Sequence, residues 1–284
     1  MNFENQTASL QLLLTLNSQL REHSLKLRMN HFAANAFAFA AGHAPTKLRT
    51  MKHALILCAA LLSGIAANAA EDGWIQLFNG KDFEGWEQHG GKAKYAVQDG
   101  VVVGTTVLGT GNSFLCTKET YGDFILEFEF KVDPKLNSGV QIRSEVFDQP
   151  KTLQIDGKEV KVPADRVHGY QIEIDMDPKN NRWWTAGIYD EARRGWLYPG
   201  SHGGDKKEFT AQGAKVSKQE DWNRVRVEAK GSSIKTWLNG ELRADIKDSM
   251  TLKGLIALQV HGVGNDKSKE NITVMWRNLR LKRL

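Results

Sequence analysis

Hydrophobic and polar residues alternate along much of the chain from residue 74 onward, and this pattern predicts β-strands. The clearest run is 124–132, where every second residue is Phe or Leu apart from one final Val, and the positions between include two glutamates and a lysine. The dipeptides Asp99-Gly100, Asp156-Gly157 and Asn239-Gly240 follow such runs and suit type I′ hairpin turns. Short strands joined by tight turns are typical of an antiparallel sandwich or barrel, so we expect an all-β fold.

Residues 71–284 are predicted to form this single β domain, because no repeat or low-complexity linker interrupts them. Residues 178–221 lack a regular pattern apart from a short A-G-I-Y run. They are rich in aromatic side chains, so we expect an ordered loop rather than a disordered one.

Three of the predicted strands carry long polar side chains on one face, where a solvent-facing strand typically carries Thr, Ser and Lys. These polar positions are Gln141 and Arg143 in the first strand, Gln171, Glu173 and Asp175 in the second, and Gln259 and His261 in the third. If the three strands are neighbours in one sheet, their polar faces form a cleft. The alternative is that each is an ordinary solvated face.

The charged side chains of this face suit acid–base chemistry or metal binding. Glu173 and Asp175 are two residues apart, which places their Cβ atoms about 6.5 to 7 Å apart on a strand. Repulsion at that distance raises one pKa, as a general acid or base needs. With Asp177 or His261 added, they could instead hold Ca²⁺ or Mn²⁺. His261 is otherwise a general base or a structural histidine, and Arg143 either clamps a substrate or neutralises Glu173.

Aromatic residues of the 178–221 segment are candidates for sugar stacking, because flat rings pack against the axial C–H groups of a pyranose. Trp196 and Tyr189 are the main candidates, and Glu191 and Arg194 bring charged groups to the same rim. The alternative is that these rings pin the segment to the sandwich.

Residues 51–70 have the features of a secretory signal peptide: a basic start, a short apolar run and a small-residue cleavage site near Ala69 or Ala70. We therefore expect a periplasmic or secreted protein without an integral membrane segment in the mature chain. Residues 1–50 are then expected to lie upstream of the true start, at Met51. The alternative is a genuine extension with an amphipathic helix around residues 10–27.

Charge and cysteine content narrow the classes of function. Residues 71–284 carry 32 Lys and Arg against 31 Asp and Glu and show no basic stripe with interleaved aromatics, so we expect no nucleic-acid partner. Cys116 is their sole cysteine, which excludes an intrachain disulfide and predicts a small buried residue. Nucleophile-elbow, phosphate-loop, dinucleotide and paired-cysteine motifs are missing from the sequence.

Several segments, taken in order, resemble the 3-keto-disaccharide hydrolase family across residues 73–284. They are L-F-N-G-K-D-F-E-G-W, N-S-G-V-Q-I-R-S, G-Y-Q-I-E-I-D, A-G-I-Y-D-E-A-R-R-G-W-L-Y-P, W-N-R-V-R-V, W-L-N-G and I-A-L-Q-V-H-G. The resemblance implies a concanavalin A-like jelly roll, which is a sandwich of two antiparallel sheets with a carbohydrate-binding concave face.

The resemblance also implies cleavage of glycosides whose C3 hydroxyl is already oxidised to a ketone. Such a ketone acidifies the C2 proton, so that a base can remove it and expel the C1 substituent before water adds. We expect Glu173 or His261 to be the base and Arg143 to polarise the enolate oxygen. In one version, a divalent metal held by Glu173, Asp175 and His261 assists Arg143. The residues expected to bind the sugar are Gln141, Gln171, Tyr189, Gln259, Trp196, Glu191 and Arg194.

Two alternatives remain at this stage. One is a non-catalytic carbohydrate-binding jelly roll, and the other is a conventional glycosidase with two carboxylates. The sequence leaves open the aglycone, the anomer and the oligomeric state.

Overall fold

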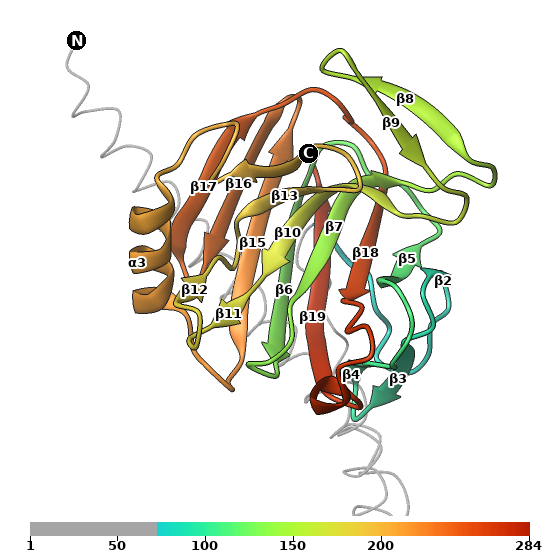
Figure 1. The fold of residues 1–284 in the computed structure, drawn as a ribbon, viewed down its shortest axis with the longest axis vertical. Helices are drawn as coiled ribbons and strands as arrows, with labels where there is room; N and C mark the ends of the chain where they lie inside the picture. The colour runs from blue at the N-terminus through green and yellow to red at the C-terminus, as the bar shows by residue number, and fades with distance from the viewer. Residues whose placement is uncertain (1–72) are drawn as a thin grey trace, which may run out of the picture. The chain divides into compact units, whose positions relative to one another are not determined.

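Two antiparallel sheets dominate the computed structural model, which describes residues 73–284 (Figure 1). The back sheet consists of β1 (Trp74–Gln76), β3 (Lys94–Gln98), β4 (Val101–Thr105), β6 (Phe124–Val132), β15 (Asn223–Lys230), β16 (Ser233–Leu238), β17 (Glu241–Lys247) and β19 (Thr273–Arg283). The front sheet consists of β2 (Trp86–Gly90), β5 (Ser113–Thr117), β7 (Ser138–Glu145), β10 (His168–Ile174), β13 (Ile188–Glu191), β14 (Gly195–Tyr198) and β18 (Leu255–Val260). The predicted two-sheet jelly roll is confirmed.

Smaller elements decorate the sandwich. They are β8 (Lys151–Ile155), β9 (Lys158–Val162), β11 (Met176–Asp177), β12 (Arg182–Trp183), α3 (Lys206–Val216) and the 3₁₀ turn η1 (Lys267–Lys269). The β8–β9 hairpin projects beyond the sheets at the upper right of Figure 1, and α3 lies at the opposite side near β12 and β17.

The strand order of the front sheet is β14-β13-β10-β7-β18-β5-β2, and that of the back sheet is β17-β16-β15-β6-β19-β4-β3, with β1 paired to β19. Strands β7, β10 and β18 are therefore neighbours, although they lie far apart in the sequence. This confirms that the three polar-faced strands share one sheet.

The predicted tight turns are present. Asp99-Gly100, Asp156-Gly157 and Asn239-Gly240 join β3 to β4, β8 to β9 and β16 to β17, and their φ angles lie between +50° and +96°. Positive φ at both central residues is the requirement of a type I′ turn, whose twist matches that of the strands it joins.

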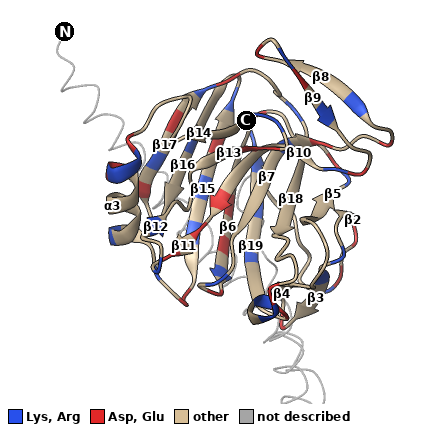
Figure 2. Ribbon diagram, viewed as in Figure 1, with Lys and Arg blue, Asp and Glu red and all other residues tan. Residues whose placement is uncertain are grey.

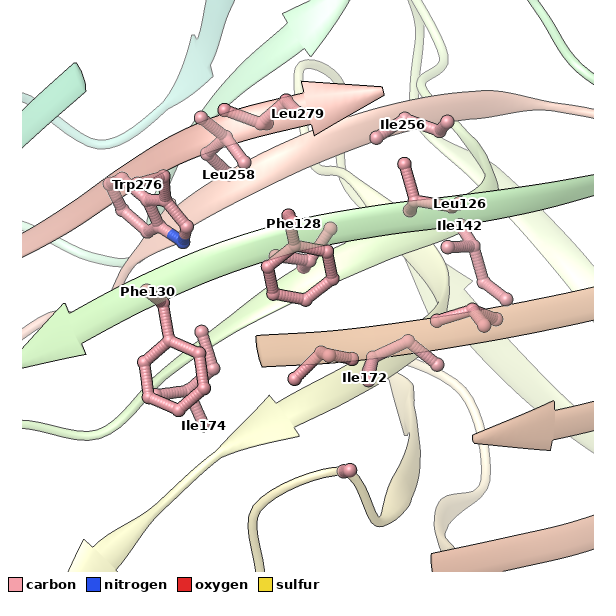
Figure 3. Close-up of a cluster of buried hydrophobic side chains, with 14 of the residues drawn as sticks. Leu126, Phe128, Phe130, Ile142, Ile172, Ile174, Ile256, Leu258, Trp276 and Leu279 are labelled. Carbon is pink, nitrogen blue, oxygen red and sulfur yellow. The ribbon is translucent and has the colours of Figure 1, made fainter. Parts of the chain in front are cut away.

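The core lies between the two sheets and follows the alternation of the strands (Figure 3). Leu126, Phe128 and Phe130 of β6 face Ile172 and Ile174 of β10, and each is at most 1% exposed. Burying side chains of this size contributes about 1.5–3 kcal/mol each to stability. Because this face of β10 points into the core, its alternate residues point away from the back sheet.

The expected loop at residues 178–221 was wrong in part, because the structure forms β12, β13, β14 and α3 there. The three strands are at most four residues long, which is too short for alternation to be recognised. Helix α3 begins after Asp205, whose carboxylate accepts hydrogen bonds from the backbone N–H groups of Lys207 and Glu208. Arg243 of β17 packs 3.6 Å from the ring centroid of Phe209 and fixes the helix to the back sheet.

Cys116 is buried, as predicted, and burial raises the pKa of its thiol further above neutral pH. Within residues 73–284, no helix combines the length and the apolar character needed to cross a membrane. The signal peptide predicted at residues 51–70 and the extension at 1–50 lie outside the described residues.

We expect Phe128→Ala to lower the free energy of unfolding by about 3–5 kcal/mol, because it leaves a cavity between the sheets that neighbouring side chains fill only in part. Urea denaturation measures the change. Ile75→Ala, at a position 38% exposed, is the control and should cost well below half as much. Equal losses in the two variants would contradict the assigned core.

Candidate functional site

A cleft of about 340 Å³ lies on the outward face of the front sheet, away from the core. Its walls come from β10, β12, β13 and β14 and from segments flanking β5, β7, β10 and β18. The lining residues are Asn112, Asn137, Arg166, Gln171, Glu173, Arg182, Tyr189, Glu191, Trp196 and His261. The structure thus brings together six of the predicted site residues: Gln171, Glu173, Tyr189, Glu191, Trp196 and His261.

The register of the sheet explains this convergence. Glu173 pairs with Gly139 of β7, and Gly139 pairs on its other side with Gln259 of β18. These three residues form one row across the sheet, and His261 lies two positions beyond Gln259. Side chains from β10 and β18 therefore approach each other over β7, where Gly139 has no side chain to separate them.

The segment 146–167, which connects β7 to β10, closes one side of the cleft. Val167 packs with Phe114, Cys116 and Ala257 in a small apolar cluster on the outward face of β5 and β18. This packing explains why β5 and β18 carry no charged residues even on their outward face (Figure 2). It also positions Arg166, whose guanidinium lies 5.6 Å from the Phe114 ring centroid, at the cleft wall.

The aromatic wall stands on the β13–β14 hairpin. The ring of Trp196 makes an edge contact with Tyr189, at 5.3 Å between centroids, and another with Trp184, at 4.5 Å. Trp196 and Tyr189 line the cleft and remain partly exposed, so their faces are available to a sugar ring.

Glu173 is the most perturbed group of the cleft. Burial, followed by the charge of Asp175, raises its pKa to about 8, although hydrogen bonds from Gln171 and Asn137 act to lower it. The Gln171 amide donates to Oε2 at 2.8 Å and the Asn137 amide donates to Oε1. The carboxyl group therefore keeps its proton at neutral pH and can act as an acid.

Asp175 extends the acidic run but is paired. Arg182 forms an ion pair with its carboxylate, and burial still raises the pKa of Asp175 to about 6. This pairing turns Asp175 toward the β11–β12 hairpin. The two acids are close enough for the charge of Asp175 to raise the pKa of Glu173, as the sequence predicted.

His261 is neutral and has one defined tautomer. Its Nδ1 lies 2.8 Å from the carbonyl oxygen of Gly262, and since a carbonyl can only accept, Nδ1 carries the proton. Nε2 is then the unprotonated nitrogen. Burial lowers the pKa of His261, with the positive charges of Lys269, Arg166 and Arg182 acting in the same direction and the Gly262 hydrogen bond opposing them. A neutral imidazole with a free lone pair at the cleft can serve as a base.

Glu191 faces the far end of the cleft. Arg166 forms an ion pair with it and Asn112 donates a hydrogen bond at 3.4 Å. Burial raises the pKa of Glu191 despite the nearby Arg166. The register sets Glu191 opposite Gly169, whereas Glu173 lies four residues further along β10. The two carboxyl-bearing residues are therefore about 13 Å apart along the strand.

The prediction that Arg143 reaches the cleft was wrong. Gly169 of β10 faces two residues of β7, Arg143 and Ser144, so the strand bulges, and Arg143 has φ +45°. The bulge turns the Arg143 side chain to the core side of the sheet. There it is fully buried and donates to the carbonyls of Gly122 (2.8 Å) and Gly231 (2.7 Å).

Arg194 is also outside the cleft, contrary to the prediction. It donates to Asp190 and to Asp248, the latter at 2.7 Å, beneath the β13–β14 hairpin. Side chains alternate along β13, so Asp190 points inward whereas Tyr189 and Glu191 face the cleft. Arg194 points inward too, because it is bonded to Asp190. Gln141 and Gln259 are fully buried and reach Gln171, so they lie beneath the cleft and do not line it.

Four lining residues were missed by the sequence reasoning: Asn112, Asn137, Arg166 and Arg182. All but Arg182, which lies on a two-residue strand, come from connecting segments, where strand alternation gives no orientation. Asn137 alone had a usable signal, because it directly precedes a polar-faced strand.

Among residues 73–284, no group of three or more His, Cys, Asp or Glu side chains is close enough together to hold a metal ion. Glu173, Asp175 and His261 therefore do not fit the metal site that their sequence pattern suggested. Asp175 is committed to Arg182, and His261 lies across the cleft on the β18 side.

Residues 73–282 match the model of the 3-keto-alpha-glucoside-1,2-lyase-like domain family. The chain belongs to this family. A 3-keto-disaccharide hydrolase of Bacteroides thetaiotaomicron is 29% identical to this lyase-like domain protein over 151 residues, which are 47% of this chain and 50% of that protein. The match thus spans about half the length of the curated relative.

Solved structures of similar fold include a Parabacteroides distasonis protein described as a candidate glycosyl hydrolase. It is 19% identical, with a TM-score of 0.45 over 75% of this chain and 94% of that one. A Bacillus subtilis protein of unknown function with a galectin-like fold is 11% identical, with a TM-score of 0.48 over 74% and 94% of the two chains.

We expect Arg143→Met to lower the stability of the lyase-like domain by about 2–4 kcal/mol and to leave the cleft unchanged. Two backbone carbonyls lose their buried donor, while no cleft residue loses a contact. Urea denaturation gives the stability, and the side-chain amide NMR signals of Asn137 and Gln171 report on the cleft.

Arg182→Met is the matched control, because it removes an arginine that does line the cleft. It should shift the Asn137 signal with a smaller loss of stability, since Arg182 is 44% exposed. Large amide shifts in Arg143→Met without destabilisation would show that Arg143 does act in the cleft.

Proposed function

We propose that the protein cleaves glycosides that carry a ketone at C3 of the sugar, by proton removal at C2 and elimination followed by hydration. Membership of the lyase-like family supports the substrate class. The observation that carries the proposal is the pairing, in one cleft, of a carboxyl group that keeps its proton near neutral pH with an imidazole that has lost its own.

These two groups match the two proton transfers of the reaction. His261 Nε2 takes the C2 proton, which the neighbouring ketone acidifies, and the electron pair is held as an enolate on C2, C3 and the ketone oxygen. The pair then forms the C1–C2 double bond as the C1–O bond breaks, and the protonated Glu173 gives its proton to the leaving oxygen. Water adds across the double bond, with its oxygen on C1 and its proton on C2.

Neutral and cationic donors beside Glu173 support the developing negative charge. Asn137 and Arg182 line the cleft with Glu173, and the N–H groups that they do not use on Glu173 and Asp175 can donate to an enolate oxygen. Arg143, the expected donor, is out of reach. Trp196 and Tyr189 supply the surface on which a sugar ring stacks.

The geometry does not favour a two-carboxylate glycosidase. A conventional glycosidase needs a second carboxyl group that is free to act with Glu173. Here Asp175 is ion-paired with Arg182, and Glu191 is ion-paired with Arg166. A non-catalytic sugar-binding module is the alternative that the aromatic wall supports. Export to the periplasm or outside, read from residues 51–70, is part of the proposal.

Purified protein should cleave a 3-keto-disaccharide or a 3-keto-aryl glucoside, and should leave the unoxidised sugars intact. Glu173→Gln and His261→Asn should each lower turnover by about 10²- to 10⁴-fold, the usual contribution of a positioned acid or base. In D₂O the released keto sugar should carry deuterium at C2.

Three controls accompany this assay. Gln154→Ala, on the projecting β8–β9 hairpin, should turn over normally. Activity should survive a chelator, because no step uses a metal. A protein that binds the keto sugar with no turnover would be a binding module, and cleavage without deuterium at C2 would contradict the elimination route.

The rate should depend on pH as a bell. Activity rises as His261 loses its proton, which happens below its ordinary pKa of 6.5, and falls as Glu173 ionises near pH 8. Initial rates from pH 5 to 10 measure this. Glu173→Gln should remove the alkaline limb of the residual activity. If that limb persists, another group supplies the proton.

A further inference from the structure

Three glutamines and a glycine form a buried layer beside Glu173, on the same face of the front sheet. Gln141 of β7 and Gln259 of β18 each donate a hydrogen bond from Nε2 to Oε1 of Gln171, both at 2.7 Å. All three side chains are at most 2% exposed. Amides from three adjacent strands thus meet at one oxygen atom.

Gly139 makes this meeting possible. It lies on β7 between Glu173 and Gln259, in the middle of the row that joins β10 to β18. A Cβ atom at this position would be 2.5 Å from Cγ and 2.6 Å from Cδ of Gln171. Any other residue here would occupy the space in which the Gln171 side chain crosses the sheet.

The two donors fix which way the Gln171 amide faces. An amide presents an acceptor on one side and a donor on the other, and here the acceptor side is occupied by two N–H groups. Turning it over would set its own N–H group against both donors. The Nε2 of Gln171 must therefore face Glu173, where it donates to Oε2 at 2.8 Å.

Glu173 is then held at both oxygens, by Gln171 on one side and by Asn137 on the other. Amides hold a carboxyl group in place without the full charge of a guanidinium, so they fix its orientation and still allow it to be protonated.

We propose that Gly139, Gln141 and Gln259 are positioning residues, which lock the Gln171 amide so that it orients the Glu173 carboxyl group. None of the three lines the cleft. The effect on turnover rests on the proposed function, whereas the ordering of the carboxyl group does not.

Loss of the lock has a defined electrostatic consequence. The Gln171 hydrogen bond acts to lower the pKa of Glu173, so its loss should raise that pKa above about 8. The other groups near the carboxyl are Asp175, Arg182, Tyr189 and His261. None of these four groups has a hydrogen bond to Gly139, Gln141 or Gln259 among the described contacts, so variants of the layer leave them in place.

The test is a pH titration of the Glu173 carboxyl group by infrared spectroscopy, with the band identified by its loss in Glu173→Gln. The measurement needs no substrate. In Gly139→Ala the new methyl group must displace Gln171, and the midpoint should move from near pH 8 upward by about one unit. Gly104→Ala is the matched control, because its Cβ would lie 2.5 Å from Val260 in the core. It should lose stability and keep the midpoint.

A second pair of variants covers the case in which Gly139→Ala does not fold. Gln141→Met with Gln259→Met removes both donors at similar volume, and Thr117→Val removes a buried hydroxyl of the same sheet outside the layer. The double variant should raise the midpoint and Thr117→Val should not. An unchanged midpoint in the double variant, or an equal shift in Thr117→Val, would overturn the proposal. Failure of the wild type to cleave keto sugars would contradict the proposed function alone.

Discussion

A carboxyl group removed from water, without a cation hydrogen-bonded to it, keeps its proton, and this constraint shapes the cleft of the front sheet. Glu173 is 3% exposed and its oxygens are held by amides. Arg182, whose positive charge acts on Glu173, is bound to Asp175. The fold therefore delivers a neutral acid to the cleft, opposite a neutral imidazole, and both groups are ready for proton transfer at neutral pH.

The back sheet shows the opposite treatment of the same residue type. Glu127 of β6 is also largely buried, on the outward face, where Lys, Arg and Glu residues lie along β6, β15 and β19 (Figure 2). Burial acts to raise its pKa, but hydrogen bonds from Arg280, Arg224 and Arg226 lower it overall. Glu127 is thus a charged residue within an ion-pair network, which stabilises a solvated face. The two sheets thus treat a buried glutamate in opposite ways, because cations surround Glu127 and amides hold Glu173.

Strand alternation and turn chemistry were sufficient to predict the sandwich, because both depend on neighbours in the sequence. The same alternation placed Gln171, Glu173 and His261 on one face. It failed at Arg143, where a bulge opposite Gly169 reverses the side on which the chain places its residues. A non-glycine residue with positive φ gives no sign of itself in the sequence, so this reversal could not be foreseen.

Other parts of the site depend on tertiary packing that no local pattern reports. Arg166 reaches the cleft because Val167 packs on β5 and β18, and Arg182 because a two-residue strand folds back on β11. The roles of Gln141 and Gln259 required the register, since the pairing of Gln141 with Gln171 and of Gln259 with Gly139 shows that both contact Gln171. The face of the strand on which a polar residue lies could be predicted from the sequence, whereas its burial and its hydrogen-bond partners could not.

The most direct test of the buried neutral carboxyl is the pH dependence of stability. The folded-state pKa of Glu173 is raised from 4.5 to about 8, so the unfolded chain releases this proton first. The contribution of Glu173 to the free energy of unfolding is therefore fully present below pH 4.5 and declines as the pH rises toward 8. Urea denaturation of wild type and Glu173→Gln across this range should show the difference between the two proteins changing by about 1.4 kcal/mol per pH unit, with the wild type losing stability. Parallel curves would show that Glu173 is already ionised in the folded protein, and would contradict the account.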